Sequence, residues 1–169
     1  MSSRRVVRAS LTAGCSTSEY RNGRKGWLSA FRDAVLFKTA NTFGLRRNEA
    51  WMLDVADFGR NPQGAEYGVL YVCHGKAMRK RRSVLTVWPW YPEIIEQWVQ
   101  QVRPQFATSV DSGASWPSER GQRIGFTQMN TRLAAYRDAL GLDPALDFHS
   151  FRRSYVTYLI EDGLDARLV

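Results

Sequence analysis

The sequence is poor in residues that hold metal ions or form disulfide frameworks. Its only cysteines are Cys15 and Cys73, and its only histidines are His74 and His149. Structural zinc sites are usually built from closely spaced pairs such as CxxC or HxxxH, and no such pair occurs. We therefore expect no metal site, and two thiols so far apart in the chain favour a reducing cytoplasm over an oxidising compartment.

Long apolar runs are also absent from the sequence. A membrane-spanning helix needs about 20 consecutive apolar residues, and no stretch of the chain comes near that length. A secretory signal needs roughly 7–15 apolar residues, but Arg8 interrupts the apolar run directly after Val6 and Val7. The sequence therefore predicts neither export nor a membrane partner.

Acidic residues are outnumbered by basic ones. The chain of 169 residues has a formal net charge of +8 and a pI of about 9.9. Such an excess favours an anionic partner, most often nucleic acid for a compact basic domain. A basic soluble protein without any such partner would have the same composition, so charge alone leaves both interpretations open.

The chain is long enough for one globular domain, and 44% of its residues are hydrophobic. Residues 1–25 hold six basic residues and a single acid, Glu19, among Ser, Thr and Gly. This composition predicts a flexible basic lead. Folded structure is expected to begin near Trp27, and residues 26–169 are expected to form the domain.

Hydrophobic periodicity predicts a mainly helical α+β fold with one small antiparallel sheet. The expected helices cover residues 27–42, 45–53, 93–102, 127–140 and 149–163. The expected strands, joined by a basic hairpin connection, cover residues 69–73 and 83–88. Turn-rich segments that we expect in loops cover residues 59–68 and 103–123. Pro92 is placed to open the third helix, and Gly141 to cap the end of the fourth.

The first predicted helix has one apolar face. Its members, recurring at helical spacing, are Leu28, Phe31, Val35 and Thr39. The charged residues Arg32, Asp33 and Lys38 are expected to lie mostly on the other faces of this helix.

The stretch GLRRNEAWML places Glu49 one helical turn after Arg46, on the same side of a short helix. The apolar stripe of that helix consists of Leu45, Met52 and Leu53. Glu49 falls within this stripe, where a carboxylate is costly unless it is paired, so we expect Arg46 or Arg47 as its partner. Taken alone, the pattern is equally satisfied by a local ion pair without any further function.

The stretch HGKAMRKRR is the most basic part of the chain. Its cationic residues are Lys76, Arg79, Lys80, Arg81 and Arg82. Like charges so close together repel each other unless an anion lies across them. Phosphate suits both the arginine fork and the lysine ammonium group. These residues are therefore candidates for nucleic-acid contact, with a solvated hairpin tip as the alternative.

The stretch DFHSFRRSYVTYL predicts a helix with two different faces. One face, at the spacing of a buried side, contains Phe151, Tyr155, Tyr158 and Leu159. His149 and Arg152 point elsewhere, near the helix N-terminus, where backbone N–H groups favour an anion. We therefore interpret the two tyrosines as core residues and the His149–Arg152 pair as a phosphate contact, although a lone histidine there could serve only as a cap.

The stretches GLRRNEAWML, GKAMRKRR and HSFRRSYVTYLIEDGLD occur in this order on a helix, a hairpin and a helix. Together they resemble the tyrosine recombinases, the phage-integrase family of site-specific DNA recombinases of bacteria, phages and mobile elements. The resemblance covers about residues 26–169. It implies the family's mainly helical catalytic domain, a double-stranded DNA partner in the cytoplasm or nucleoid, and strand cleavage and rejoining through a 3′-phosphotyrosyl intermediate with no metal or nucleotide cofactor.

The resemblance also implies roles for single residues. Arg46 and Arg152 resemble the two arginines that clamp the scissile phosphate, where their forks would stabilise the extra negative charge of the transition state. Lys76 resembles the hairpin lysine that protonates the leaving 5′ oxygen, and His149 the histidine that assists proton transfer. Glu49 would orient the groups that touch the phosphate. The hairpin residues that would bind DNA are Arg79, Lys80, Arg81 and Arg82.

The chain departs from the family beyond the H-x-x-R helix. Family members carry a further histidine or tryptophan and then the nucleophilic tyrosine beyond the H-x-x-R helix, whereas Val169 lies 17 residues after Arg152. We therefore expect a C-terminally incomplete catalytic domain that has no nucleophile and is inactive alone, with a full-length recombinase protomer as a candidate partner. The alternatives are a non-catalytic DNA-binding module that occupies recombination sites and a remnant without activity.

Overall fold

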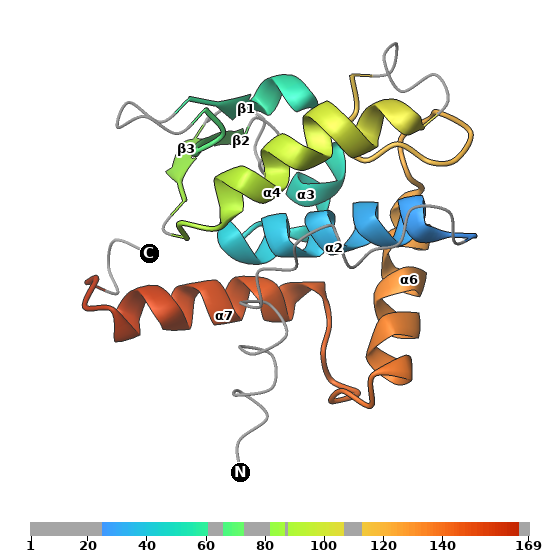
Figure 1. Cartoon of the computed structure of the whole chain (residues 1–169). Coiled ribbons are helices and arrows are strands. Elements are labelled where there is room, and N and C mark those ends of the chain that lie inside the picture. The colour runs from blue at the N-terminus through green and yellow to red at the C-terminus, as the bar shows by residue number, and fades with distance from the viewer. Residues whose placement is uncertain (1–24, 61–65, 73–81, 87, 107–112, 166–169) are drawn as a thin grey trace.

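The computed structural model describes residues 25–60, 66–72, 82–86, 88–106 and 113–165 (Figure 1). Its helices are α2 (Trp27–Thr42), α3 (Arg47–Met52), α4 (Tyr91–Gln97), α6 (Phe126–Ala139) and α7 (Phe148–Glu161). Its strands are β1 (Phe58–Gly59), β2 (Val69–Val72) and β3 (Arg82–Leu85). The predicted α+β class, mainly helical with one small antiparallel sheet, is confirmed. The basic lead predicted at 1–25 lies almost entirely outside the described residues.

The sheet has three antiparallel strands in the order β1-β2-β3. Leu70 in β2 is paired with Phe58 on one side and with Val84 on the other. The two longer strands lie where the alternation of side chains predicts them, but β1 falls at the start of the turn-rich segment and was not predicted. A strand of two residues has no periodicity of its own, and only its pairing with β2 defines it.

Helix α2 lies between the other elements (Figure 1). Helix α7 runs along one side of α2, α4 lies on the opposite side, and α6 crosses near one end. Because α2 is covered on several sides, ten of its sixteen residues are buried. An amphipathic helix at a protein surface buries one stripe only, so the single apolar face predicted for α2 underestimates its burial.

The burial of two charged residues of α2 differs most clearly from what the sequence predicts. Arg32 and Asp33 were expected on exposed faces, but each is only 1% exposed. Arg32 donates from Nε and Nη2 to Oδ1 of Asp33, at 3.0 and 2.8 Å. Arg132 and Tyr136 of α6 donate to the other carboxylate oxygen, Tyr136 from its hydroxyl at 3.0 Å. The buried carboxylate is therefore fully paired, which is the condition under which a protein interior accepts a charge.

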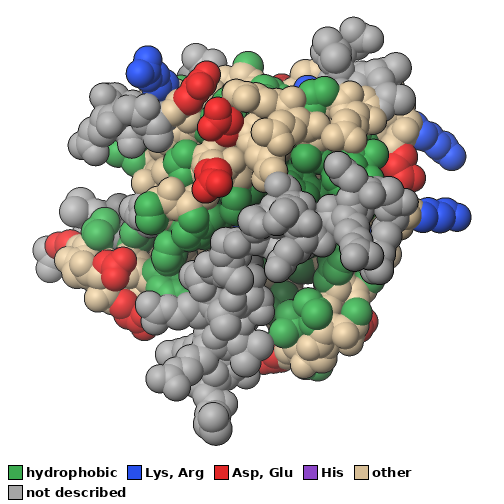
Figure 2. Space-filling model, viewed as in Figure 1, with side chains coloured by type: hydrophobic (Ala, Val, Ile, Leu, Met, Phe, Trp, Pro, Cys, Tyr) green, Lys and Arg blue, Asp and Glu red, His purple; other side chains and the backbone are tan. Residues whose placement is uncertain are grey.

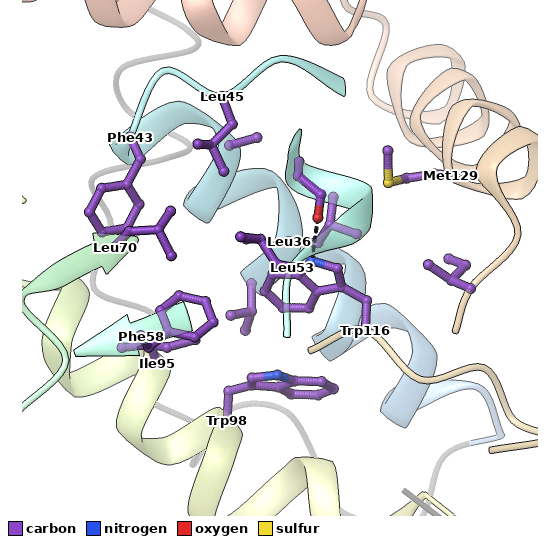
Figure 3. Packing of buried hydrophobic residues seen from close by; sticks show 14 of the residues in the cluster. Leu36, Phe43, Leu45, Leu53, Phe58, Leu70, Ile95, Trp98, Trp116 and Met129 are labelled. Carbon is purple, nitrogen blue, oxygen red and sulfur yellow. Dashed lines mark hydrogen bonds between the residues drawn. The ribbon is translucent and has the colours of Figure 1, made fainter. Parts of the chain in front are cut away.

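The largest core side chains are Trp98 and Trp116, both fully buried (Figure 3). Trp116 donates from Nε1 to the carbonyl of Ala50 at 2.8 Å, and Trp98 donates to that of Ser115 at 3.0 Å. Residues 103–123 lack long regular elements in their described part, as expected, but the side chain of Trp116 from this segment lies in the core. Each indole satisfies its buried N–H with a backbone carbonyl, so both rings pack at little polar cost.

The ends of the helices agree with the predicted ends to within about two residues. The helix expected at 93–102 begins at Tyr91, has Pro92 in its first turn, and continues as a π-helical turn over Trp98–Val102. Gly141 follows α6 with a φ of +61°, as a C-terminal cap requires. Helix α7 begins one residue earlier than expected, because Asp147 accepts a hydrogen bond from the backbone N–H of Ser150 at 2.8 Å.

Hydrophobic side chains are visible in the band between α4 and α7 (Figure 2). Few Lys and Arg side chains appear on this side of the molecule. The exposed large apolar residues of the described ranges are Tyr71, Leu85, Leu140, Ile160 and Leu164. No helix in the described part of the chain is long and apolar enough to cross a membrane.

Candidate nucleic-acid interface

The turn between α2 and α3 packs against α7. It thereby brings together the stretch that contains Arg46 and the stretch that contains Arg152. Gly44 has a φ of +57°, and a Cβ at this position would lie 2.3 Å from Cδ1 of Tyr155. The carbonyl of Gly44 accepts a hydrogen bond of 2.6 Å from Nη1 of Arg152. Only glycine combines this backbone conformation with so close an approach, so the glycine of the GLRR stretch allows α7 to pack onto the turn.

Glu49 lies at the centre of the site. Its side chain is only 2% exposed. Oε1 accepts a hydrogen bond of 3.0 Å from Nη1 of Arg46, and Oε2 accepts one of 2.8 Å from the Arg46 backbone N–H. The predicted burial of Glu49 and its pairing with Arg46 are confirmed. Arg47, the alternative partner, instead lies over the ring of Phe126, with its Cζ atom 4.2 Å from the ring centroid.

A second arginine shares the same carboxylate. Arg82, the first residue of β3, donates from Nη2 to Oε2 of Glu49 at 2.8 Å. The sequence placed Arg82 with the hairpin residues that would bind DNA and gave no indication of this contact. Since the two residues lie 33 positions apart, no local spacing rule could have found it.

Arg152 lies within the electrostatic field of both other arginines. Its pKa is lowered, first by partial burial and then by the positive charges of Arg46 and Arg82, while the negative charge of Glu49 acts in the opposite direction. Three guanidinium groups therefore gather around one carboxylate. Their positive charge exceeds what Glu49 can neutralise, and this excess favours the binding of an anion.

His149 is exposed near the N-terminus of α7. It lines a cavity of about 480 Å³ together with Arg46 and Arg47 of the α3 segment. The remaining lining residues come from α6 and from the connection to α7: Asn130, Leu133, Ala134, Arg137, Leu146, Asp147 and Phe148. Two candidate residues from separate sequence motifs, Arg46 and His149, thus face the same cavity.

The other hairpin candidates, Lys76, Arg79, Lys80 and Arg81, lie outside the described residues. Their expected roles remain predictions. Among the described residues, no group of three His, Cys, Asp or Glu side chains is placed to hold a metal ion.

The two tyrosines of α7 only partly match their expected positions. Phe151 and Leu159, on the same predicted face, are both 6% exposed, but Tyr155 and Tyr158 are only partly buried. Tyr158 makes an edge contact with Trp88 at 5.5 Å between ring centroids. The expectation that both tyrosines are turned away from Arg152 is wrong for Tyr155, because its ring covers the glycine whose carbonyl Arg152 binds.

The ionisation of Tyr155 reflects this position. Burial raises the pKa of its hydroxyl, and the positive charges of Arg82 and Arg152 oppose that rise without cancelling it. The phenol is therefore more strongly held in its neutral form than an exposed tyrosine. A neutral phenol without an adjacent base is a weak nucleophile.

Comparisons with known proteins identify the family of this chain. The family model described as "Phage integrase family" matches residues 25–169. Tyrosine recombinase XerC of Mycobacterium sp. (strain KMS) is 28% identical over 140 residues, which cover 83% of this chain and 44% of that protein. Tyrosine recombinase XerC of Alcanivorax borkumensis is 35% identical over 75 residues, or 44% of this chain and 24% of that protein.

Solved structures show the same fold. The XerH site-specific recombinase bound to its difH substrate superposes with a TM-score of 0.68 at 20% identity, over 95% of this chain and 44% of that one. The XerA recombinase gives a TM-score of 0.66 at 18% identity, over 82% and 46%. The chain spans less than half the length of each of these relatives. Because the family model matches most of the chain and the fold agrees, this chain belongs to the phage integrase family.

Proposed function

We propose that this chain forms part of the catalytic domain of a site-specific DNA recombinase and binds duplex DNA through its phosphodiester backbone. The observation that carries the proposal is the group of arginines around Glu49. Their combined positive charge is larger than the single negative charge of this buried carboxylate. The similar XerH recombinase was solved bound to its difH substrate, which supports DNA as the anion.

In this proposal Arg46 and Arg152 hold the scissile phosphate from two sides. Negative charge builds up on the phosphoryl oxygens as the bond to the attacking group forms, and fixed arginine forks stabilise that charge without reorganising. His149 assists proton transfer, Lys76 protonates the leaving 5′ oxygen, and Glu49 keeps Arg46 in position. Each of these assignments follows the family resemblance residue by residue.

We assign no nucleophile among the described residues. Tyr158 packs against Trp88, and the ring of Tyr155 is fixed over Gly44 with its hydroxyl held neutral by burial. A tyrosine supplied by a second, complete recombinase protomer would then carry out cleavage. We expect this chain alone to form no SDS-resistant adduct with a nicked suicide DNA substrate. A covalent band that Tyr155→Phe abolishes would contradict this assignment.

DNA binding is tested by the salt dependence of affinity. Phosphate contacts release condensed counterions, so about five contacts give a slope of log K against log salt of roughly −4 to −5. Fluorescence anisotropy with a short duplex should show this slope, and Arg152→Gln should make it shallower. Arg120→Gln is the matched control, because Arg120 is exposed in the turn at 118–121. A slope near zero for the unmodified chain would refute the proposal.

A non-catalytic module that occupies recombination sites is the second candidate. The packing of the two α7 tyrosines supports it, because Tyr158 contacts the ring of Trp88 and the ring of Tyr155 lies over Gly44. Normal salt-dependent binding that does not increase the covalent adduct formed by a complete recombinase would support this candidate. An adduct that forms on the complete protomer and increases when this chain is present would instead support the shared catalytic role.

A further inference from the structure

Arg82 is the residue of the basic hairpin stretch that the structure describes, and it contacts a buried carboxylate. Its Nη2 lies 2.8 Å from Oε2 of Glu49, a carboxylate that is 2% exposed, while the Arg82 side chain itself is 37% exposed. Arg46 has the same relationship to Glu49 at 3.0 Å and is 52% exposed. Each arginine therefore has one edge on a buried carboxylate and the rest of its fork at the surface.

The charge of Arg82 exceeds what the buried carboxylate requires. Arg46 already supplies Glu49 with a full positive charge and with hydrogen bonds from both its side chain and its backbone. A second guanidinium on the same carboxylate adds a charge that is also felt by Arg152. Three positive charges near a single carboxylate leave a net positive charge, which attracts a further anion.

The geometry leaves part of the Arg82 fork available. A guanidinium has five N–H donors, and among the described residues Arg82 donates to Glu49 alone. A fork fixed on one edge by a carboxylate loses little further conformational freedom when its other edge binds an oxyanion. Glu49 fixes Arg46 and Arg82 in this way at the same time, although they come from different elements, the start of α3 and the start of β3.

We propose that Arg82 is a third anion-contacting arginine of this site, and that Glu49 is the positioning residue that holds the forks of Arg46 and Arg82 towards one DNA phosphate or two adjacent ones. This inference rests on the proposed function, since the anion is a phosphodiester of duplex DNA.

The test uses the salt slope, which a purely structural arginine would not change. Loss of one phosphate contact makes the slope shallower by about 0.9. We expect Arg82→Gln to show this change together with weaker binding of a fluorescein-labelled duplex. Arg82→Lys keeps the charge but loses the fork, so its slope should equal that of the unmodified chain while its affinity falls. Arg120→Gln, the exposed control, should change neither. An unchanged slope for Arg82→Gln, with only its melting temperature lowered, would overturn the inference.

Glu49→Gln tests the positioning role separately. This change removes a negative charge from a DNA-binding site, which by electrostatics alone should tighten binding. If Glu49 aligns the two forks, binding should weaken instead, and tighter binding would overturn its positioning role. Circular dichroism melts establish that each variant is folded, and Arg82→Lys remains informative if Arg82→Gln does not fold. Loss of salt dependence in the unmodified chain would overturn the proposed function, whereas a normal slope there with no effect of Arg82→Gln would overturn only the inference about Arg82.

Discussion

Replacing Arg46 by alanine should destabilise the fold less than an ordinary broken buried ion pair. Removing one partner of a buried pair typically costs about 3–5 kcal/mol. Here Arg46→Ala leaves Glu49 with the backbone N–H of residue 46 and with Arg82 at 2.8 Å. The lost hydrogen bond to a charged group is worth about 1.5–3 kcal/mol, and the 52% exposure of Arg46 reduces this to roughly 1–2 kcal/mol. Arg82→Ala should have a similar cost for the same reason.

The double variant Arg46→Ala/Arg82→Ala should behave differently from the two single variants. Among the described residues, Glu49 would then keep one backbone donor as a buried carboxylate, so the full cost of about 3–5 kcal/mol returns. We expect this cost to exceed the sum of the single costs by about 1 kcal/mol. Urea unfolding followed by circular dichroism measures each value, with Arg120→Ala as the control. Strict additivity of the two single costs would refute the argument that the two arginines share one carboxylate.

Other predictions concern the surroundings of this site and the core. Gly44→Ala should cost about 2–5 kcal/mol in urea unfolding, because its positive φ is unfavourable for alanine and the new Cβ would overlap the ring of Tyr155. Trp116→Ala should cost about 3–5 kcal/mol and lower the soluble yield, because it empties a fully buried site and removes a hydrogen bond. Burial acts to raise the pKa of Asp147, but hydrogen bonds from Ser150 and nearby positive charges outweigh it and the pKa is lowered. The stability from this cap should therefore be present above the unfolded pKa of about 3.9 and lost as the pH falls through the lower folded value. Asp147→Ala should remove about 1 kcal/mol at neutral pH and show a smaller loss of melting temperature on acidification.

The features of the fold that could be predicted are those encoded by local spacing. The apolar period of α2 and the alternation in β2 and β3 are properties of single segments, so they were identified correctly. Burial of Asp33 could not be predicted in this way, because its partners Arg132 and Tyr136 lie about one hundred positions away. The two-residue strand β1 was missed for the same reason, since only its pairing with β2 defines it.

In the site, too, contacts within one segment could be predicted and contacts between separate elements could not. The pairing of Arg46 with Glu49 spans one helical turn and follows from the cost of an unpaired carboxylate in an apolar stripe. The contact of Arg82 with Glu49 joins separate elements, and nothing in the basic hairpin distinguishes Arg82 from its neighbours. The position of Tyr155 was misjudged because helical periodicity assigns a residue to a face of its own helix, whereas the face of α7 that meets Gly44 depends on packing against another element.

The three arginines of the site come from three elements, yet each is fixed by the same short segment of the chain. Arg46 and Arg82 bind the carboxylate of Glu49, and Arg152 binds the carbonyl of Gly44. Residues 44–49 therefore set the positions of all three guanidinium groups relative to one another. A shift of this segment would move all three guanidinium groups at once, so we expect the proposed phosphate binding to depend on the rigidity of the turn as much as on the charges themselves. The three residue types act together in this segment: the glycine allows α7 to approach, the glutamate holds the guanidinium groups of Arg46 and Arg82, and in the proposed function the arginine contacts the phosphate.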